Sequence, residues 1–204
     1  LDGSRVVPLE AFLAGDTHGV IDFPVAPRDE SEALCARLLG TWKPTAVVAV
    51  ERCGRTPDGS YRNMRGEDIG AVTAGLDGLF DPTRCETVGV GDGGNEIGMG
   101  GLAEAIIEQQ VTAWPCITAV RHAVIASVSN WGAYGLCAGL SMEAGRTLLP
   151  DEETATRDLA RVIELGGLDG VTRQPTVTVD GRSADENAAL LRNLHVLVNA
   201  HLHP

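Results

Sequence analysis

The sequence is poor in basic residues and contains no long apolar run, and each shortage excludes a class of protein. Its 204 residues include 16 Lys and Arg against 28 Asp and Glu, which gives a formal net charge of −12. Because such an acidic chain repels nucleic acid phosphates and anionic lipid headgroups, we expect no nucleic acid and no membrane as a partner. The least polar stretch, residues 123–140, contains Ser127, Ser129, Asn130 and three glycines. This pattern predicts a buried strand and helix rather than a membrane span.

Several sequence signals of cofactor sites and of export are also missing. The five cysteines are widely spaced and include no C-x-x-C pair, which favours a reducing, cytoplasmic location. No two histidines have the i, i+4 spacing of a zinc-binding helix, and no G-K-[ST] sequence predicts a phosphate-binding loop. The chain does not open on a charged-then-apolar signal. It begins at Leu1 rather than Met, so we expect any address carried upstream to lie outside this sequence.

Short apolar runs alternate with longer helical patterns, and this alternation predicts an α/β fold. We expect one domain over residues 1–204, a three-layer fold with a mostly parallel sheet, helices on both faces and Rossmann-like topology. The expected strands are Val6–Leu9, Gly19–Val25, Thr45–Val50, Glu86–Val90, Ala123–Val128 and Thr176–Val179. The first expected helix is capped by Asp29 and closed by Gly40, and the next two are Asp68–Leu79 and Asn95–Gln110. A fourth contains Ala155–Ile163, and the last begins with a capping box formed by Ser183 and Glu186.

The loop from Arg52 to Gly66 is the longest stretch without an apolar period, and long ordered loops are usually functional. It concentrates Arg52, Arg55, Arg62 and Arg65 in an otherwise acidic protein. Guanidinium groups bind carboxylates bidentately, which favours a small anionic substrate. The alternative is a solvated loop whose surface ion pairs contribute little.

Polar residues follow three of the expected strands directly, where open parallel sheets bind their ligands. Glu51 and Arg52 follow the first, Gly91–Glu96 the second, and Ser129–Trp131 the third. If these strands are neighbours, the three groups converge on one cleft.

Residues 89–94, GVGDGG, match the dinucleotide fingerprint G-x-G-x-x-G. Asp92 and Glu96 would repel a pyrophosphate from this turn, and no acidic residue follows between Gln109 and Ser141 to hold a ribose. We therefore expect no nicotinamide and no flavin.

A glycine-rich turn with carboxylates suits a divalent cation, with Glu51 as a third ligand. The alternative is that Asp92 and Glu96 only cap a helix that begins near Asn95. Asn130 either donates to an oxyanion or caps the helix that follows it.

Five segments carry a resemblance to a known family. They are VERCGR at 50–55, NMRG at 63–66, GVGDGGNEIGMG at 89–100, VSNWGAYGL at 128–136 and LDGVT at 168–172. In this order they closely resemble the D-glutamate cyclase C-terminal domain family, from about Phe23 to the terminal helix. Cys53 stands where the family usually has proline, and we expect the family's opening strand and acidic loop to be absent before Leu1.

The resemblance implies a lyase that converts D-glutamate, a small anionic substrate, to 5-oxo-D-proline and water. From the carboxylates of the glycine-rich turn we expect a divalent cation, Mg²⁺ or Mn²⁺, as the cofactor. Ring closure needs an uncharged α-amine, stabilised oxygen charge and the departure of water. We therefore expect Glu51 or Glu96 to act as general base and Asn130 to stabilise the oxyanion. The expected metal ligands are Asp92, Glu96 and Glu51. The expected substrate-binding residues are Arg52, Arg65, Asn63, Asn95, Ser129, Gly91, Gly93 and Gly94.

Three other functions use the same residues. A metal-dependent hydrolase of a small phosphate or amide would need the same carboxylates and arginines. A non-catalytic module that binds an acidic metabolite would show saturable thermal stabilisation by its ligand without turnover. A dinucleotide-dependent oxidoreductase is the third. The sequence leaves open whether the chain forms a homo-oligomer.

Overall fold

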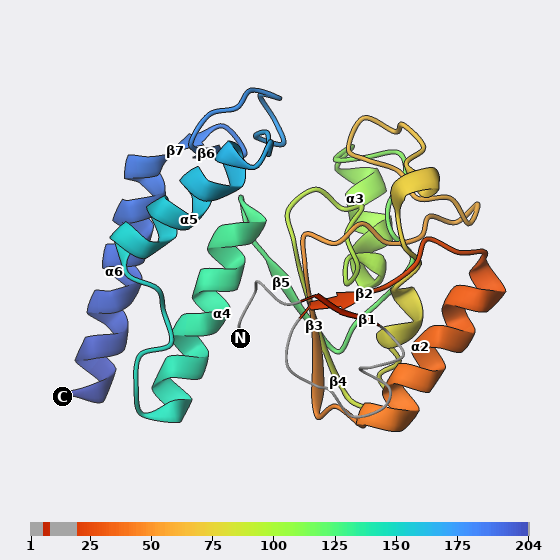
Figure 1. Ribbon diagram of the computed structural model, residues 1–204, viewed down its shortest axis with the longest axis horizontal. Coiled ribbons are helices and arrows are strands. Elements are labelled where there is room, and N and C mark those ends of the chain that lie inside the picture. The colour runs from red at the N-terminus through yellow and green to blue at the C-terminus, as the bar shows by residue number, and fades with distance from the viewer. Residues whose placement is uncertain (1–5, 9–19, 204) are drawn as a thin grey trace. The chain divides into compact units, whose positions relative to one another are not determined.

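A computed structural model describes residues 6–8 and 20–203 of the chain (Figure 1). These fold into two compact units, Leu1–Ala123 and Val124–Pro204, each with a core of its own. The boundary between the units falls within strand β5, His122–Ile125. The single domain expected over residues 1–204 stays a prediction, and each unit is described by itself.

The central sheet has three parallel strands in the order β3-β4-β5. β3, Ala46–Val50, pairs with β4, Glu86–Gly91, so that Ala46 lies opposite Glu86 and Val50 opposite Val90. β1, Val6–Pro8, and β2, Val20–Asp22, form a separate parallel pair. The mixed α/β fold with a parallel sheet is confirmed, whereas the three-layer, Rossmann-like arrangement stays a prediction. The expected strand ends at Leu9 and Gly19 lie outside the described residues.

Helix α2, Arg28–Trp42, is present as expected, but its ends differ from the predicted ones. Its buried residues are Ser31, Cys35, Leu38 and Leu39, the i, i+4, i+7 and i+8 positions of one helical face. The caps expected at Asp29 and Gly40 are wrong. Both residues lie inside the helix, which begins after Pro27 and ends at Lys43, where the backbone is left-handed with φ 50°.

The helix expected over Asp68–Leu79 is wrong, because this segment forms two short 3₁₀ helices, η1, Gly70–Val72, and η2, Asp77–Leu79. Each glycine in a helix interior costs about 1 kcal/mol relative to alanine, and the segment contains three glycines. One of them, Gly75, lies against Tyr61 and Ser31, where an added Cβ would come within 3.1 to 3.3 Å of their atoms. Two short 3₁₀ helices packed against neighbouring segments therefore replace the expected α-helix.

The helix expected over Asn95–Gln110 is confirmed only in its second half, as α3, Ala103–Glu108, preceded by the 3₁₀ helix η3, Gly100–Leu102. The residues before η3 lie in close contact with other backbone segments. A Cβ on Gly100 would lie 2.3 Å from the carbonyl oxygen of Ile117. Gly98 has φ 109°, and its Cβ would lie 2.8 Å from the Cα of Gly89 in β4. Over residues 95–99 the backbone follows these contacts instead of an α-helical path, and the α-helix begins only at Ala103.

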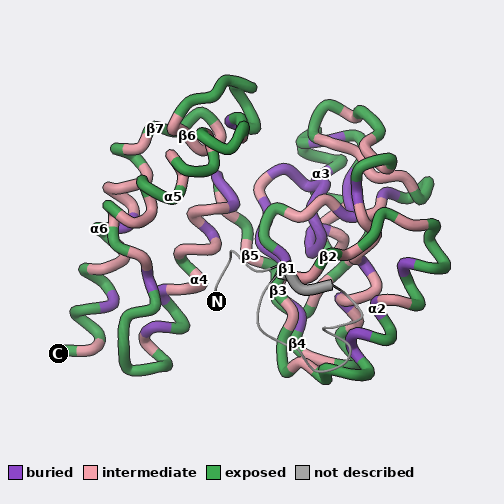
Figure 2. Tube along the Cα trace, in the orientation of Figure 1, coloured by how far each residue is buried: buried purple, intermediate pink, exposed green. Residues whose placement is uncertain are grey.

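The core of the first unit lies beside the turn that follows β4. Ala49, Phe80 and Ile97 are buried together, with Val47 and Val120 packed against them. Every residue from Gly93 to Met99 is buried (Figure 2). The glycine-rich turn is therefore an interior element rather than a surface loop.

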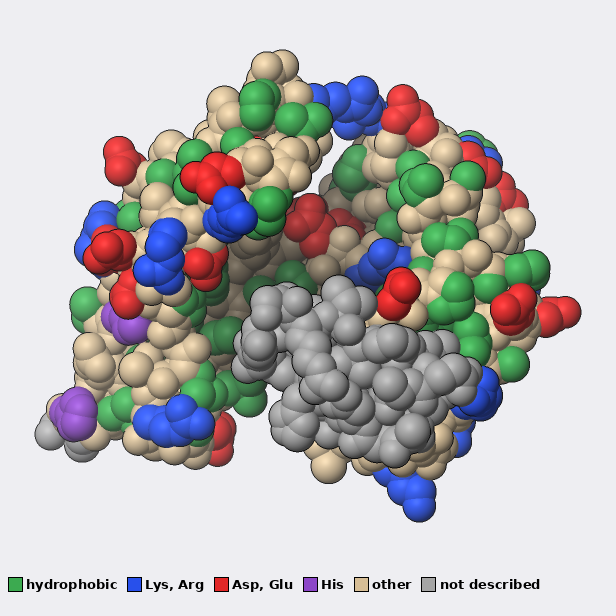
Figure 3. Space-filling view, viewed as in Figure 1, with side chains coloured by type: hydrophobic (Ala, Val, Ile, Leu, Met, Phe, Trp, Pro, Cys, Tyr) green, Lys and Arg blue, Asp and Glu red, His purple; other side chains and the backbone are tan. Residues whose placement is uncertain are grey.

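The second unit is helical. It contains α4, Ser129–Ala144, α5, Glu152–Glu164, and α6, Ala184–Leu202, with a small antiparallel pair, β6, Thr178–Val179, and β7, Arg182–Ser183. The capping box of Ser183 and Glu186 at the start of α6 is confirmed. Acidic and basic side chains lie among one another on this unit's surface (Figure 3), as in the pair Arg161–Glu164 at 2.9 Å. No helix of the described residues is long and apolar enough to cross a membrane.

Asp169, from the LDGVT segment, organises the loop between α5 and α6. Its carboxylate accepts hydrogen bonds from the N–H groups of Val171, Thr172 and Gly181 and from the hydroxyl of Thr178, at 2.6 to 3.0 Å. The residue is buried. Burial acts to raise the pKa of Asp169, but these hydrogen bonds outweigh it and hold the pKa well below its usual range. The motif therefore has a structural explanation.

Replacing Asp169 with alanine should lower the free energy of unfolding by about 3 kcal/mol, because four donors lose a charged acceptor. Urea denaturation followed by circular dichroism measures this. Because the folded-state pKa lies below the unfolded value, the contribution is present at neutral pH and is lost as the pH falls below about 4. The control is Asp158→Ala, whose side chain is 70% exposed, with an expected effect below about 0.5 kcal/mol. Equal effects of the two substitutions would contradict this role.

Candidate functional site

The turn that follows β4 is closed by the side chain of Glu96. Its Oε1 accepts hydrogen bonds from the backbone N–H of Gly93 at 2.8 Å and of Asp92 at 3.3 Å. Because no helix begins near Asn95, the interpretation of Asp92 and Glu96 as helix caps is wrong. The carboxyl group of Glu96 instead binds the glycine-rich turn from within.

The glycines of this turn lie where neighbouring side chains already occupy the space beside the backbone. A Cβ on Gly91 would lie 3.0 Å from Oε2 of Glu96, and one on Gly93 would lie 2.2 Å from the sulfur of Met64. Gly94 has φ 90°, which side chains rarely adopt. Within the G-x-G-x-x-G match, Gly91 thus leaves space for the carboxyl group of Glu96. The expected absence of a nicotinamide or flavin stays a prediction.

Glu96 is 3% exposed, and its Oε2 has no hydrogen-bond partner among the described residues. Burial raises the pKa of Glu96, and the neighbouring charge of Asp92 raises it further, against the N–H donors of the turn, which lower it. A buried carboxyl group with a raised pKa and one unsatisfied oxygen is typical of a catalytic acid or base.

The segment that follows β3 runs beside this turn. Glu51 is exposed and has a left-handed backbone, φ 52°, and its N–H donates to the carbonyl of Val90. The N–H of Ile97 donates to the carbonyl of Arg52 at 2.8 Å, and Cys53 pairs with Glu96 in an antiparallel bridge. Non-glycine residues in a left-handed conformation cluster at functional sites. The structure therefore brings the segments that carry Glu51 and Glu96 side by side.

Most of the loop arginines stabilise the loop itself. Arg52 donates to the carbonyl of Ala74, and Arg55 forms an ion pair with Glu32 at 3.1 Å. Arg62 donates to the carbonyl of Gly66 at 2.9 Å, forms an ion pair with Asp58 and lies 4.3 Å from the ring centre of Trp114. These contacts explain why a long loop without helix or strand is ordered.

The remaining expected substrate-binding residues of this unit also have structural contacts. Asn63 accepts from the N–H groups of Arg65 and Glu67 and so forms a turn, in which the Arg65 side chain is exposed. The side chain of Asn95 donates to the carbonyl of Arg62 at 2.9 Å. The thiol of Cys53, at the family's proline position, donates to the same carbonyl at 3.2 Å. The substrate-binding role of Asn63, Asn95, Arg52 and Arg65 stays a prediction.

Ser129 and Asn130 belong to the second unit and open helix α4. The cap of this helix is Val128, so the interpretation of Asn130 as its cap is wrong. Asn130 lines a pocket of about 260 Å³ with residues of α5 and α6, such as Leu159 and Asn187. The role of Ser129 and Asn130 in the same site as Glu51 and Glu96 stays a prediction.

The described residues contain no group of three or more His, Cys, Asp or Glu side chains that could hold a metal ion. Glu51, Asp92 and Glu96 are therefore not gathered as a three-carboxylate set. The divalent cation stays a prediction, and no chemical step is assigned to it below.

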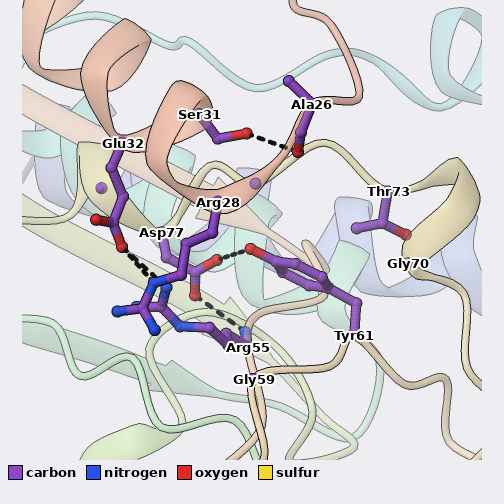
Figure 4. Close-up of a pocket in the computed structure, with 12 residues that line it drawn as sticks. Ala26, Arg28, Ser31, Glu32, Arg55, Gly59, Tyr61, Gly70, Thr73 and Asp77 are labelled. Atoms are coloured by element: carbon purple, nitrogen blue, oxygen red, sulfur yellow. Dashed lines mark hydrogen bonds and ion pairs between the residues drawn. The ribbon is translucent and has the colours of Figure 1, made fainter.

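A pocket that sequence reasoning missed lies in the first unit (Figure 4). Its floor is Asp77, which accepts from the hydroxyl of Tyr61 at 2.6 Å, from the N–H of Arg55 at 3.0 Å and from the hydroxyl of Thr118. Hydrogen bonding to Asp77 and, above all, burial raise the pKa of Tyr61. The sequence predicts a helix over Asp68–Leu79, and within such a helix nothing marks Asp77 as a pocket residue.

Replacing Asp77 with alanine should leave two hydroxyl groups and one N–H without their acceptor and lower the free energy of unfolding by about 3 kcal/mol. We expect the loop that contains Arg55 and Tyr61 to lose its protection against amide hydrogen exchange, measured by mass spectrometry. Asp29→Ala, on the exposed surface of α2, is the matched control. Unchanged exchange in the Asp77 variant would show that the loop is held by other contacts.

Comparisons with known proteins agree with the resemblance. A family model described as D-glutamate cyclase-like, C-terminal, matches residues 5–195. The mitochondrial D-glutamate cyclase of Homo sapiens is 41% identical over 100 residues, which are 46% of this chain and 16% of the human protein. The aligned region is thus a small part of that relative. The match over residues 5–195 shows that the chain belongs to the D-glutamate cyclase-like, C-terminal family.

Proposed function

We propose that this chain is a lyase of the D-glutamate cyclase type, which converts D-glutamate to 5-oxo-D-proline and water. The observation that carries the proposal is Glu96, a buried carboxyl group with a raised pKa and an unpaired Oε2, within a segment typical of the family. The named activity of the human relative supports the choice of substrate.

The reaction requires two protons to move from the substrate ammonium group to one oxygen of its γ-carboxylate. The amine nitrogen forms a bond to the γ-carboxyl carbon, one carbon–oxygen bond breaks, and that oxygen leaves as water. A base must accept a proton before the attack, and an acid must protonate the leaving oxygen. Two carboxyl groups in different environments can divide these tasks.

Glu96 suits the acid and Glu51 suits the base. Burial favours the neutral form of Glu96, so that Oε2 can carry the proton given to the leaving oxygen. Glu51 is exposed at the end of β3, beside the turn of Glu96. Glu51 accepts the first ammonium proton and gives it to the leaving oxygen, which receives its second proton from Glu96 and departs as water. The N–H groups of Asp92 and Gly93 stabilise the carboxylate left on Glu96 after transfer, and the second proton lost by the substrate nitrogen restores the neutral form of Glu96.

The direct test is incubation of the chain with D-glutamate and separately with L-glutamate, with and without EDTA, followed by chromatography for 5-oxoproline. We expect product from D-glutamate. Glu96→Gln should lower kcat at least about 100-fold, the usual contribution of a general acid. Glu104→Gln, an exposed residue at the start of α3, should leave kcat unchanged. If neither enantiomer gives product when Mg²⁺ or Mn²⁺ is supplied, the proposal is rejected.

The pH dependence provides a separate prediction. Because Glu96 must be protonated, kcat should fall as the pH rises through its raised pKa.

The raised pKa of Glu96 also affects stability. The folded-state pKa lies above the unfolded value of about 4.3, so stability is lost as the pH rises from the unfolded to the folded pKa. Glu96→Gln should therefore be more stable than the parent at neutral pH, with the difference disappearing below about pH 4. Equal stability at both pH values would contradict a raised pKa.

A further inference from the structure

The pocket above Asp77 has a volume of about 140 Å³, which suits a small metabolite better than a nucleotide or a peptide. It is lined by the start of α2, the arginine-rich loop and the 3₁₀ segments. Charged side chains at its edge are Arg28, Arg55 and Glu32 (Figure 4). No residue of the turn 91–96 lines it, so the pocket is separate from the carboxyl group of Glu96.

Two guanidinium groups share one carboxylate oxygen in this pocket. Arg28 Nε and Arg55 Nη1 donate to Oε1 of Glu32 at 2.7 and 3.1 Å. Nη1 and Nη2 of Arg28 and Nη2 of Arg55 donate no hydrogen bond within the described part of the chain. The Arg55 side chain is only 17% exposed, so its charge is poorly screened by water. The edge of the pocket therefore has one positive charge and several donors in excess.

Three of the four carboxylate oxygens of the pocket already accept hydrogen bonds, and only Oε2 of Glu32 accepts none within the described part of the chain. Both oxygens of Asp77 accept from Tyr61, Thr118 and Arg55, and one oxygen of Glu32 accepts from both arginines. An ammonium ligand would therefore compete with these donors, whereas an anion would meet free ones. Arg28, Arg55, Glu32 and Asp77 are formally neutral together, so the free guanidinium donors, rather than a net charge, favour an anion here.

We propose that this pocket binds the carboxylate group of a small organic acid, held by the free guanidinium nitrogens of Arg28 and Arg55. The planar guanidinium fork matches a carboxylate bidentately. The site goes beyond the proposed cyclase activity, because its occupancy does not require Glu96 or turnover.

Occupancy of the pocket acts on the loop beside the turn of Glu96. The N–H of Arg55 donates to Asp77, and its carbonyl accepts from the N–H of Ile117 at 2.8 Å. The preceding residue, Gly54, donates to the carbonyl of Asn95 at 2.9 Å. A ligand that restricts the motion of Arg55 therefore also restricts the loop segment that is hydrogen-bonded to the Glu96 turn.

The experiment is isothermal titration calorimetry of the chain with succinate, and in separate titrations with inorganic phosphate and with butylammonium chloride. We expect saturable binding of succinate. Arg28→Gln should weaken it about tenfold, the effect of losing one charge-assisted hydrogen bond of about 1.4 kcal/mol. Arg55→Gln should abolish it.

The matched control is Arg161→Gln in α5. Arg28 and Arg161 are both 64% exposed on a helix and paired with a glutamate one turn later, but Arg161 lies far from this pocket in sequence and does not line it. Succinate affinity should be unchanged in the control. Because Arg28 is exposed, its replacement tests the site even if Arg55→Gln disturbs the loop, which circular dichroism would reveal.

Three results would overturn the proposal: no saturable binding of succinate, equal weakening by Arg28→Gln and Arg161→Gln, or tighter binding of phosphate or butylammonium than of succinate. The titration is made without turnover, so its failure is distinguishable from failure of the cyclase proposal. Loss of succinate binding in Glu96→Gln would show that the two sites are one, and would likewise reject a separate pocket.

Discussion

The first unit depends on one buried carboxyl group that binds the turn between two strand-end segments. Glu96 holds the N–H groups of Asp92 and Gly93, while its neighbours Asn95 and Ile97 pair with the loop that follows β3. Burial of a carboxyl group costs free energy unless it is fully hydrogen-bonded, and here one oxygen is not. The surrounding contacts must offset this cost of burial. Functional groups commonly destabilise a protein in this way, and the rest of the structure compensates.

The sequence predicts the parallel strands and the amphipathic helices well, because both depend on local apolar periodicity. β3, β4, α2 and α6 lie close to their predicted ranges, and the Ser183–Glu186 capping box is present. The errors are concentrated in two glycine-containing segments, 68–79 and 95–102. Apolar spacing there is compatible with a helix, but contacts with distant backbone, such as Gly100 against Ile117, decide the conformation.

The candidate site was predictable in its residue types but not in their roles. Glycine and carboxylate after a strand point to chemistry, yet only the structure distinguishes the buried Glu96 from the exposed Glu51. The arginines illustrate the reverse case. Their concentration in one loop suggests a ligand, whereas Arg52 and Arg62 mainly hold backbone carbonyls. Asp77 and Tyr61, which are 16 positions apart in the chain, meet only through tertiary folding.

The contact between Gly89 and Gly98 restricts how this protein can change over evolutionary time. A methyl group on Gly89 would lie 2.7 Å from the Cα of Gly98, and one on Gly98 would lie 2.8 Å from the Cα of Gly89. The obstacle at each position is main chain, so no smaller side chain at the other position can relieve it. Neither codon can compensate for a change in the other, and both positions should remain invariant wherever descendants keep this turn.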